Sequence, residues 1–166
     1  MIAPNRTTTL RLADADATAR LAAGIAPLLR AGDVILLNGP IGAGKTHFAR
    51  SLIQARLATA GRAEDVPSPT FTLIQTYEAD GVELWHADLY RLTDPDEASE
   101  LGLEEAFTQA VCLIEWPDRL GGLRPAQALD VTLTPDPTSD LRVARFSGDA
   151  DHWAGLFAHL DGWRDE

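Results

Sequence analysis

Short apolar runs divide the chain, and two of them are almost wholly apolar. Residues 34–38 read Val-Ile-Leu-Leu-Asn and residues 111–115 read Val-Cys-Leu-Ile-Glu. Runs of this length and composition are typical of strands that are buried on both faces of a parallel sheet. Glu115, at the end of the second run, would then lie at the carboxyl edge of the sheet, where α/β proteins bind ligands.

Three longer segments place apolar side chains at helical spacing. Residues 16–30 are the first predicted helix, which Pro27 should kink or end early. The second predicted helix spans 46–60 and is stopped by Gly61. The third spans 150–160, where apolar residues recur at i, i+3, i+4 and i+7, so this helix is expected to pack on the sheet.

Two β-hairpins are predicted from β-rich runs bounded by turn residues. Residues 71–77 and 82–86 would pair across an Asp-Gly turn. Residues 128–134 and 141–147 flank a turn rich in Pro, Asp and Ser, and would pair in the same way. An extended segment is also expected near the start of the chain, at 7–12.

A short helix is predicted to begin at Asp94. This residue suits the N-cap, Pro95 suits the first helical position, and Glu97 is placed for a capping box. Gly102 is expected to end the helix.

The junction after the first apolar run carries a complete phosphate-binding loop, Gly-Pro-Ile-Gly-Ala-Gly-Lys-Thr, at residues 39–46. A predicted strand precedes it and a predicted helix follows, which is the context that the motif requires. The glycines let backbone N–H groups surround a phosphate at a helix N-terminus, where peptide dipoles favour negative charge. Lys45 would reach the β- and γ-phosphates, and Thr46 would offer its hydroxyl to Mg²⁺.

These elements predict an α/β protein with a three-layer, P-loop NTPase-like fold. Its mixed sheet would have a parallel core and antiparallel hairpins, flanked by helices. At 166 residues, the chain is expected to form a single P-loop ATPase domain, 1–166. The residues expected to contact the nucleotide are Gly39, Ile41, Gly42, Ala43, Gly44, Lys45, Thr46, His47 and Trp116.

Charge and cysteine content restrict the expected binding partners and cellular compartment. The chain has 14 Lys and Arg against 25 Asp and Glu, a net charge of −11, so direct binding of tRNA or DNA is disfavoured. A single cysteine, Cys112, excludes an intramolecular disulfide and fits a reducing compartment. No segment approaches the roughly 18 continuous apolar residues of a membrane span. We expect a soluble, cytoplasmic protein without membrane association.

Hydrolysis requires a second Mg²⁺ anchor and a group that orients water for in-line attack. Glu115 is the best candidate for the metal carboxylate, because it directly follows an apolar strand. Asp88 suits either the positioning of water or the Mg²⁺ shell, and Thr70 suits an approach to the metal or the γ-phosphate. The spacing of these residues in the sequence does not distinguish these roles from structural ones, a turn hydroxyl for Thr70 and a helix cap or loop carboxylate for Asp88. Trp116 suits stacking on the base, a partner surface or the core.

Four sequence blocks, in this order, resemble the bacterial TsaE (YjeE) family. They lie at 37–46, 68–73 (Ser-Pro-Thr-Phe-Thr-Leu), 86–92 (His-Ala-Asp-Leu-Tyr-Arg-Leu) and 115–116 (Glu-Trp). The resemblance implies a small ATPase, using ATP and Mg²⁺, that is needed for the threonylcarbamoyladenosine modification of tRNA. It further implies docking on a complex of TsaD and TsaB, with ATP turnover supporting repeated cycles and tRNA involved only indirectly.

The resemblance also assigns residues by position. It places Lys45 on phosphate and Thr46 on Mg²⁺, makes Glu115 a Walker B-like metal carboxylate, and makes Asp88 a second functional acid. Thr70 falls in a switch-like segment of the family.

Other positions follow the family less closely. Trp116 matches a characteristic, nucleotide-linked tryptophan, and adenine contacts are implied near Asp14 to Thr18. Many relatives carry an acidic residue where Pro40 stands, and Thr or Ser where His47 stands.

Three rival functions use the same loop. A small-molecule kinase would need a lid of clustered arginines, whereas the late arginines are scattered. A GTP switch would need an Asn-Lys-x-Asp motif, which the chain lacks. A non-hydrolysing interaction module would bind nucleotide without turnover. For the ATPase, we expect weak activity alone and stimulation by partners, with Lys45 solvated and unpaired in the absence of ligand. The late arginines are Arg119, Arg124, Arg142 and Arg145.

Overall fold

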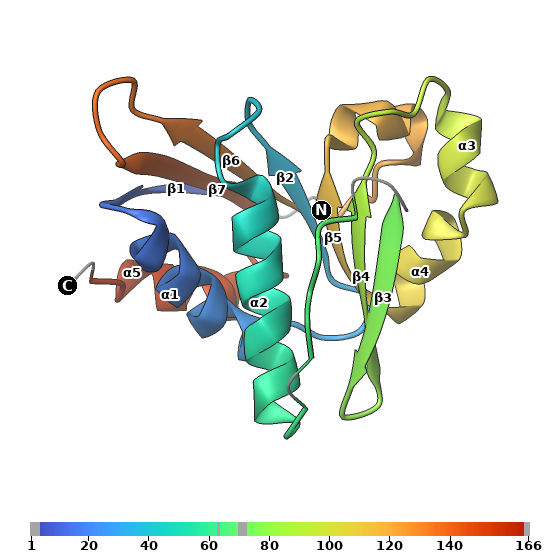
Figure 1. The fold of residues 1–166 in the computed structure, drawn as a ribbon, viewed down its shortest axis with the longest axis horizontal. Coiled ribbons are helices and arrows are strands. Elements are labelled where there is room, and N and C mark those ends of the chain that lie inside the picture. The colour runs from blue at the N-terminus through green and yellow to red at the C-terminus, as the bar shows by residue number, and fades with distance from the viewer. Residues whose placement is uncertain (1–3, 63, 70–72, 165–166) are drawn as a thin grey trace.

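The computed structural model describes residues 4–62, 64–69 and 73–164. A seven-stranded sheet runs through it in the order β1-β7-β6-β2-β5-β4-β3 (Figure 1). The strands are β1 (Asn5–Leu12), β2 (Val34–Asn38), β3 (Ile74–Ala79), β4 (Val82–Asp88), β5 (Val111–Glu115), β6 (Leu129–Pro135) and β7 (Arg142–Asp149). The helices are α1 (Ala15–Ile25), α2 (Lys45–Thr59), α3 (Pro95–Glu100), α4 (Leu103–Gln109) and α5 (Ala154–Asp161), with 3₁₀ turns η1 (Ala26–Leu28) and η2 (Pro117–Leu123).

The sheet is mixed, as predicted. Its centre is parallel, because β2 pairs in parallel with β5 and β6, and β5 with β4. Both predicted hairpins are present as the antiparallel pairs β3–β4 and β6–β7. The N-terminal strand β1 adds an antiparallel edge to β7. The predicted fold class is therefore confirmed.

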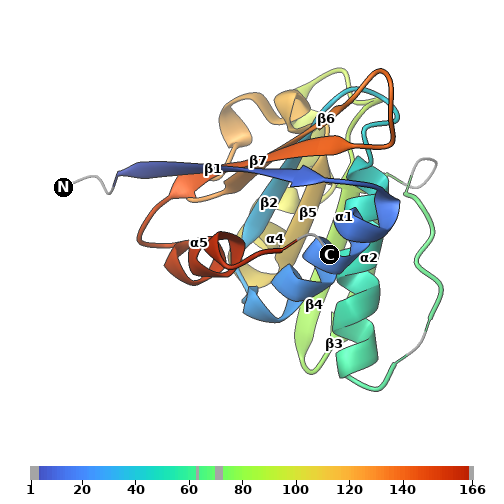
Figure 2. The same ribbon diagram turned by 90° about the vertical axis from the view of Figure 1, so that its left-hand side faces the viewer.

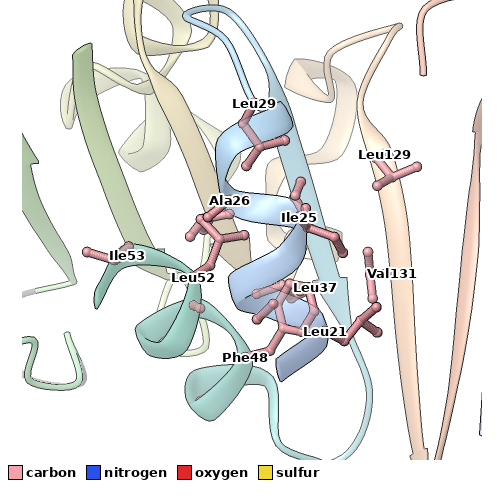
Figure 3. Packing of buried hydrophobic residues seen from close by; sticks show 14 of the residues in the cluster. Leu21, Ile25, Ala26, Leu29, Leu37, Phe48, Leu52, Ile53, Leu129 and Val131 are labelled. Carbon is pink, nitrogen blue, oxygen red and sulfur yellow. The ribbon is translucent and has the colours of Figure 1, made fainter. Parts of the chain in front are cut away.

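Helices cover both faces of the sheet and make three layers. Helices α1, α2 and α5 pack on one face, where the larger apolar cluster includes Ile35 and Leu37 of β2 (Figure 2). Figure 3 shows Leu21 of α1 and Phe48 of α2 packed beside Leu37. Helices α3 and α4 and the turn η2 cover the other face, against Leu36 and its neighbours. Alternate residues of β2 therefore serve two cores, which explains why its sequence is apolar throughout.

Turn and cap residues set the helix ends. Helix α1 stops at Ile25, and Pro27 lies in the 3₁₀ turn that follows. Gly61, with φ +74°, follows the end of α2. Asp94 caps α3 by accepting the Asp96 N–H at 2.9 Å, as predicted. Glu97 accepts the Thr93 hydroxyl at 2.9 Å through its side chain.

Two elements differ from the sequence prediction. Helix α4 follows directly on Gly102 and was not predicted, because the pattern of its seven residues is too short to stand out. Helix α5 begins at Ala154 rather than at 150. The reason is a turn at Asp149, whose carboxylate accepts the N–H groups of Asp151 and His152, each at 2.9 Å. Of the predicted strand 71–77, residues 71–72 lie outside the described residues.

The parallel strands bring the predicted site together at their carboxyl ends. In the register of the sheet, Leu37 lies opposite Glu115, and Glu115 lies opposite Asp88. The phosphate-binding loop leaves β2 at the same edge and leads into α2. Among the described residues, no helix combines the length and apolarity that crossing a membrane requires.

Candidate functional site

A cleft of about 580 Å³ opens at this edge of the sheet. Most predicted site residues line it, and so do two others. Tyr90 was not singled out from the sequence, and for Arg91 the sequence favoured a local salt bridge to Asp94 or Glu97 over a role in sensing phosphate charge. Gly39 is not among the lining residues. The predicted residues that line the cleft are Ile41, Gly42, Ala43, Gly44, Lys45, Thr46, His47, Asp88, Glu115 and Trp116.

Position 39, at the start of the loop, requires a glycine for structural reasons. Its φ is +143°, and a Cβ at this position would lie 2.5 Å from the Leu133 carbonyl oxygen of β6. The loop therefore starts pressed against the neighbouring strand. Gly44, with φ +102°, forms the N-cap of α2 and turns the chain into the helix.

Lys45 is folded back onto its own loop. Its ammonium donates to the carbonyl oxygens of Gly39 and, at 3.1 Å, of Pro40, and it lies 3.9 Å from the centre of the Trp116 ring. The residue is 5% exposed. The prediction that Lys45 is solvated and unpaired is therefore wrong. Two loop carbonyls and the Trp116 ring enclose the ammonium instead.

Burial also changes the acidity of Lys45. Desolvation lowers the pKa of its ammonium below 10.5, because the charged form is disfavoured away from water. The carboxylates of Glu115, Asp88 and Asp118 act in the opposite direction. A phosphate beside Lys45 would act in the same direction as these carboxylates, because negative charge favours the ammonium form.

Thr46, Glu115 and His86 form a chain of hydrogen bonds. The Thr46 hydroxyl donates to Glu115 Oε1 at 2.7 Å, and His86 Nε2 lies 2.7 Å from Glu115 Oε2. Both Glu115 and His86 are buried, at 2% and 0% exposure. A carboxylate accepts hydrogen bonds, so the His86 nitrogen donates. The carboxylate is held at both oxygens before any ligand arrives.

His86 was missed as a site residue by the sequence interpretation. It lies two positions before Asp88 on β4, and side chains two apart share one face of a strand. That alternation was the available signal. Because the strand Val111–Glu115 lies next to β4, the face that carries Asp88 also directs His86 at Glu115.

The oxygen groups fit Mg²⁺ in the company of phosphate. Mg²⁺ is commonly held by a hydroxyl or one or two carboxylates together with substrate phosphates. Thr46 and Glu115 provide such a pair, and Asp88 lines the same cleft. Across the described residues, no group of three or more His, Cys, Asp and Glu is placed to hold a metal ion. The oxygen donors that are present suit a cation that shares its coordination with a phosphate group.

Asp88 is an unusually basic carboxylate for its type. Burial raises its pKa above 3.8, and the negative charge of Glu115 adds to the rise. The Tyr90 N–H, which donates to Asp88 Oδ1 at 3.0 Å, opposes it. The backbone of Asp88 is also fixed, because its N–H donates to the Leu73 carbonyl at 2.8 Å. Backbone hydrogen bonds thus hold Asp88 in place at the wall of the cleft.

An aromatic pair borders the cleft. Trp116 has a left-handed backbone, φ +58°, which turns the chain from β5 into η2. Its ring lies 4.9 Å from that of Tyr90 between centroids. Tyr90 is 47% exposed, and Ile41 at the tip of the loop is 76% exposed. Trp116 is therefore part of the site, and two exposed apolar side chains, Ile41 and Tyr90, border the cleft.

The predicted switch segment is seen in part. Thr70 lies outside the described residues, so its predicted role stays a prediction. Next to it, the Leu73 N–H donates to the Pro69 carbonyl at 2.8 Å. Since Leu73 also accepts from the Asp88 N–H, this segment is joined to Asp88 through the backbone.

A second hollow, of about 400 Å³, adjoins the loop on the side of α1. It shares Ala43, Gly44 and His47 with the first cleft. Its other walls include Asp14 and Thr18, in the segment where the sequence resemblance implied adenine contacts. His47 Nε2 lies 2.8 Å from the Ala15 carbonyl oxygen, which joins α2 to the start of α1.

Comparisons with known proteins agree on one family. The family model described as "Threonylcarbamoyl adenosine biosynthesis protein TsaE" matches residues 12–143. A protein of Rickettsia conorii named "tRNA threonylcarbamoyladenosine biosynthesis protein TsaE" is 42% identical over 116 residues, which cover 70% of this chain and 65% of that protein. This chain thus spans slightly less than two thirds of that relative. The Bacillus subtilis protein of the same name is 36% identical over 124 residues, covering 74% and 75%.

A solved structure is similar over nearly the whole chain. The crystal structure of Bacillus subtilis YdiB superposes with a TM-score of 0.75 at 28% sequence identity, and the match covers 95% of this chain and 96% of that one.

Proposed function

This chain belongs to the TsaE family of threonylcarbamoyladenosine biosynthesis proteins, and from that premise we propose that it is a P-loop ATPase that binds MgATP in the cleft. Hydrolysis would support the threonylcarbamoyladenosine modification of tRNA through a complex of TsaD and TsaB. The observation that carries the proposal is the 2.7 Å contact between the Thr46 hydroxyl and Glu115, beside the phosphate-binding loop. These two groups are the Mg²⁺ anchors that such an enzyme requires.

Each residue has a distinct part in this proposal. Lys45 would leave its carbonyl contacts to bind phosphate, since a phosphate is a stronger partner for an ammonium than a backbone oxygen. Thr46 and Glu115 would hold Mg²⁺, which neutralises developing charge on the phosphates when it is bound. Asp88 would position the attacking water or complete the Mg²⁺ shell. The nucleoside would occupy the second hollow beside Asp14 and Thr18.

A dependence on partners follows from the rim of the cleft. Ile41 and Tyr90 are two of the three large apolar side chains classed as exposed among the described residues, and both border this cleft. Exposed apolar groups gathered at one place mark sites of protein association. A TsaD–TsaB complex seated there would cover the phosphates and exclude water. Turnover is therefore expected to be slow without partners.

Phosphate release, measured with and without purified TsaD and TsaB, tests the proposal. We expect a stimulation of about tenfold or more, lost in Lys45→Met, because the partner orders the site. Unstimulated turnover together with phosphate transfer to a metabolite would indicate a kinase instead. Tight ATP binding without turnover in any mixture would indicate a non-hydrolysing interaction module.

A further inference from the structure

We propose that Arg142 is a positioning residue of the phosphate-binding loop, holding its peptide units in the orientation that binds phosphate and placing a positive charge behind them. The proposal rests on the nucleotide site proposed above. Arg142 opens the last strand, β7, about 100 residues after the loop in the chain. The sequence interpretation considered it only as a scattered arginine of a possible kinase lid.

The Arg142 guanidinium reaches the outer side of the loop. Its Nε donates to the Ala43 carbonyl at 3.1 Å, and its Nη2 donates to the Gly42 carbonyl at 3.4 Å. Its Nη1 donates to the carbonyls of Asp140 and Leu141, at 3.1 and 3.4 Å. One planar group therefore ties the loop to the turn between β6 and β7.

Through the geometry of the peptide unit, these hydrogen bonds orient the N–H groups of the loop. In a planar trans peptide, the C=O and the following N–H point in opposite directions. Holding the Ala43 carbonyl toward Arg142 therefore directs the Gly44 N–H away from it, and Gly44 lines the cleft. The Gly42 carbonyl fixes the preceding peptide unit, whose Ala43 N–H donates to the Pro40 carbonyl at 3.1 Å and so closes the turn of the loop. A backbone N–H directed like that of Gly44 is the kind that binds phosphate at a helix N-terminus.

The charge of Arg142 is a second contribution. Over the part of the chain that the structure describes, its side chain donates to backbone carbonyls and forms no ion pair. Among the described residues its positive charge therefore has no direct ion-pair partner, although Asp14, Asp16 and Asp140 line the same hollow as Arg142. Its attraction for phosphates grows with the number of phosphate charges.

Lysine would not replace this arginine. An ammonium keeps the charge, but it lacks the planar fork that serves several acceptors at once. Arg145 provides a matched control on the same strand. It is exposed and faces the opposite side of the sheet from Arg142, because side chains three apart on a strand point to opposite faces.

The experiment compares nucleotide binding by wild type, Arg142→Met, Arg142→Lys and Arg145→Met, using calorimetry with MgATP, MgADP and adenosine. We expect Arg142→Met to weaken MgATP binding about tenfold or more, as loss of a charged donor does, and to weaken adenosine binding by a clearly smaller factor, since Arg142 also lines the second hollow. Arg142→Lys should recover part of the loss, and Arg145→Met should match wild type. Circular dichroism and thermal unfolding check that every variant is folded.

The possible results separate the two proposals. Equal MgATP affinity in wild type and folded Arg142→Met would overturn the role of Arg142 and leave the proposed function intact. An equal loss for adenosine and MgATP would also overturn it, because a role through the phosphates would then be wrong. If Arg142→Met fails to fold, the affinity of Arg142→Lys for MgATP is the test. Full wild-type affinity in Arg142→Lys would overturn the positioning role, because lysine lacks the planar fork of donors. If wild type fails to bind MgATP, both proposals fall.

Discussion

The hydroxyl of Thr46 and the carboxylate of Glu115 meet at 2.7 Å although 69 positions separate them in the chain. Thr46 is the last residue of the phosphate-binding loop and the second residue of α2, and Glu115 ends a neighbouring parallel strand. The sheet register therefore creates this pair: Glu115 lies opposite Leu37, just before the loop starts. Glu115 is buried and Thr46 is partly buried, so the hydrogen bond between them fixes both side chains beside the loop.

Replacing Glu115 with Gln should weaken the dependence of ATP binding on Mg²⁺ without weakening ATP binding in the absence of Mg²⁺. Gln keeps the shape and one acceptor oxygen but removes the negative charge that a hard cation prefers. We expect turnover in the presence of partners to fall about 10²-fold, while ATP binding in EDTA stays within about twofold. Titration of ATP binding against Mg²⁺ measures this directly. Glu78→Gln, an exposed position on β3, is the control. Unchanged Mg²⁺ dependence would show that Glu115 does not hold the metal.

Replacing His86 with Leu should destabilise the protein. Glu115 Oε2 would lose the donor that lies 2.7 Å away and would stay buried without a partner. Such a loss typically lowers the free energy of unfolding by about 1–3 kcal/mol. His86→Gln retains an N–H donor and should recover part of the loss. Urea unfolding measures the stability of wild type and of both variants. Equal urea midpoints for wild type and His86→Leu would contradict the expected loss of stability.

Asp88→Asn should be more stable than wild type near neutral pH and less active. Burial raises the pKa of Asp88 in the folded state, so the folded protein binds more protons than the unfolded chain between pH 3.8 and that raised value. Stability therefore falls as pH rises through this window, and ionised Asp88 costs stability above it. Asn removes the cost, and the advantage should vanish below about pH 3.8.

Denaturant midpoints measured from pH 3.5 to 7.5 test this sign. Asp151→Asn, at an exposed position, is the control. Turnover with partners should fall about tenfold or more in Asp88→Asn, because the carboxylate orients water or Mg²⁺. A variant less stable than wild type at pH 7 would show that ionised Asp88 stabilises the fold.

Nucleotide binding should change the fluorescence of Trp116. The Lys45 ammonium lies 3.9 Å from its ring centre, and a phosphate is expected to draw the ammonium away. We expect ATP to alter the emission of wild type and of Trp85→Phe, whose position lies outside the cleft lining. Trp116→Phe should lose the response while still binding ATP by calorimetry. A response that survives in Trp116→Phe would locate the change elsewhere.

Local sequence determined the elements that carry the site. The apolar run before the loop became β2, the run ending in Glu115 became β5, and the Asp-Gly turn joined β3 to β4. Each of these follows from interactions between near neighbours or from burial on both faces. Helix α4 escaped prediction because its seven residues carry too little pattern.

The residues around Lys45 could not be predicted in the same way. Lys45 was expected in water, yet Trp116 and two loop carbonyls enclose it. These contacts depend on the path of the chain from β5 into η2 and on the closure of the loop. The residues next to Lys45 in the sequence indicate neither. The same holds for His86, whose partner is chosen by the pairing of β4 with β5.

The sequence by itself determined that the chain carries a phosphate-binding loop between a strand and a helix, and which acidic residues accompany it. Tertiary structure alone decided which of these groups touch. Register between parallel strands placed Glu115 on Thr46 and His86, and the last hairpin placed Arg142 behind the loop. The reason is physical. Motifs are set by local backbone requirements, whereas contacts between distant side chains are set by strand pairing and packing, which no single segment encodes.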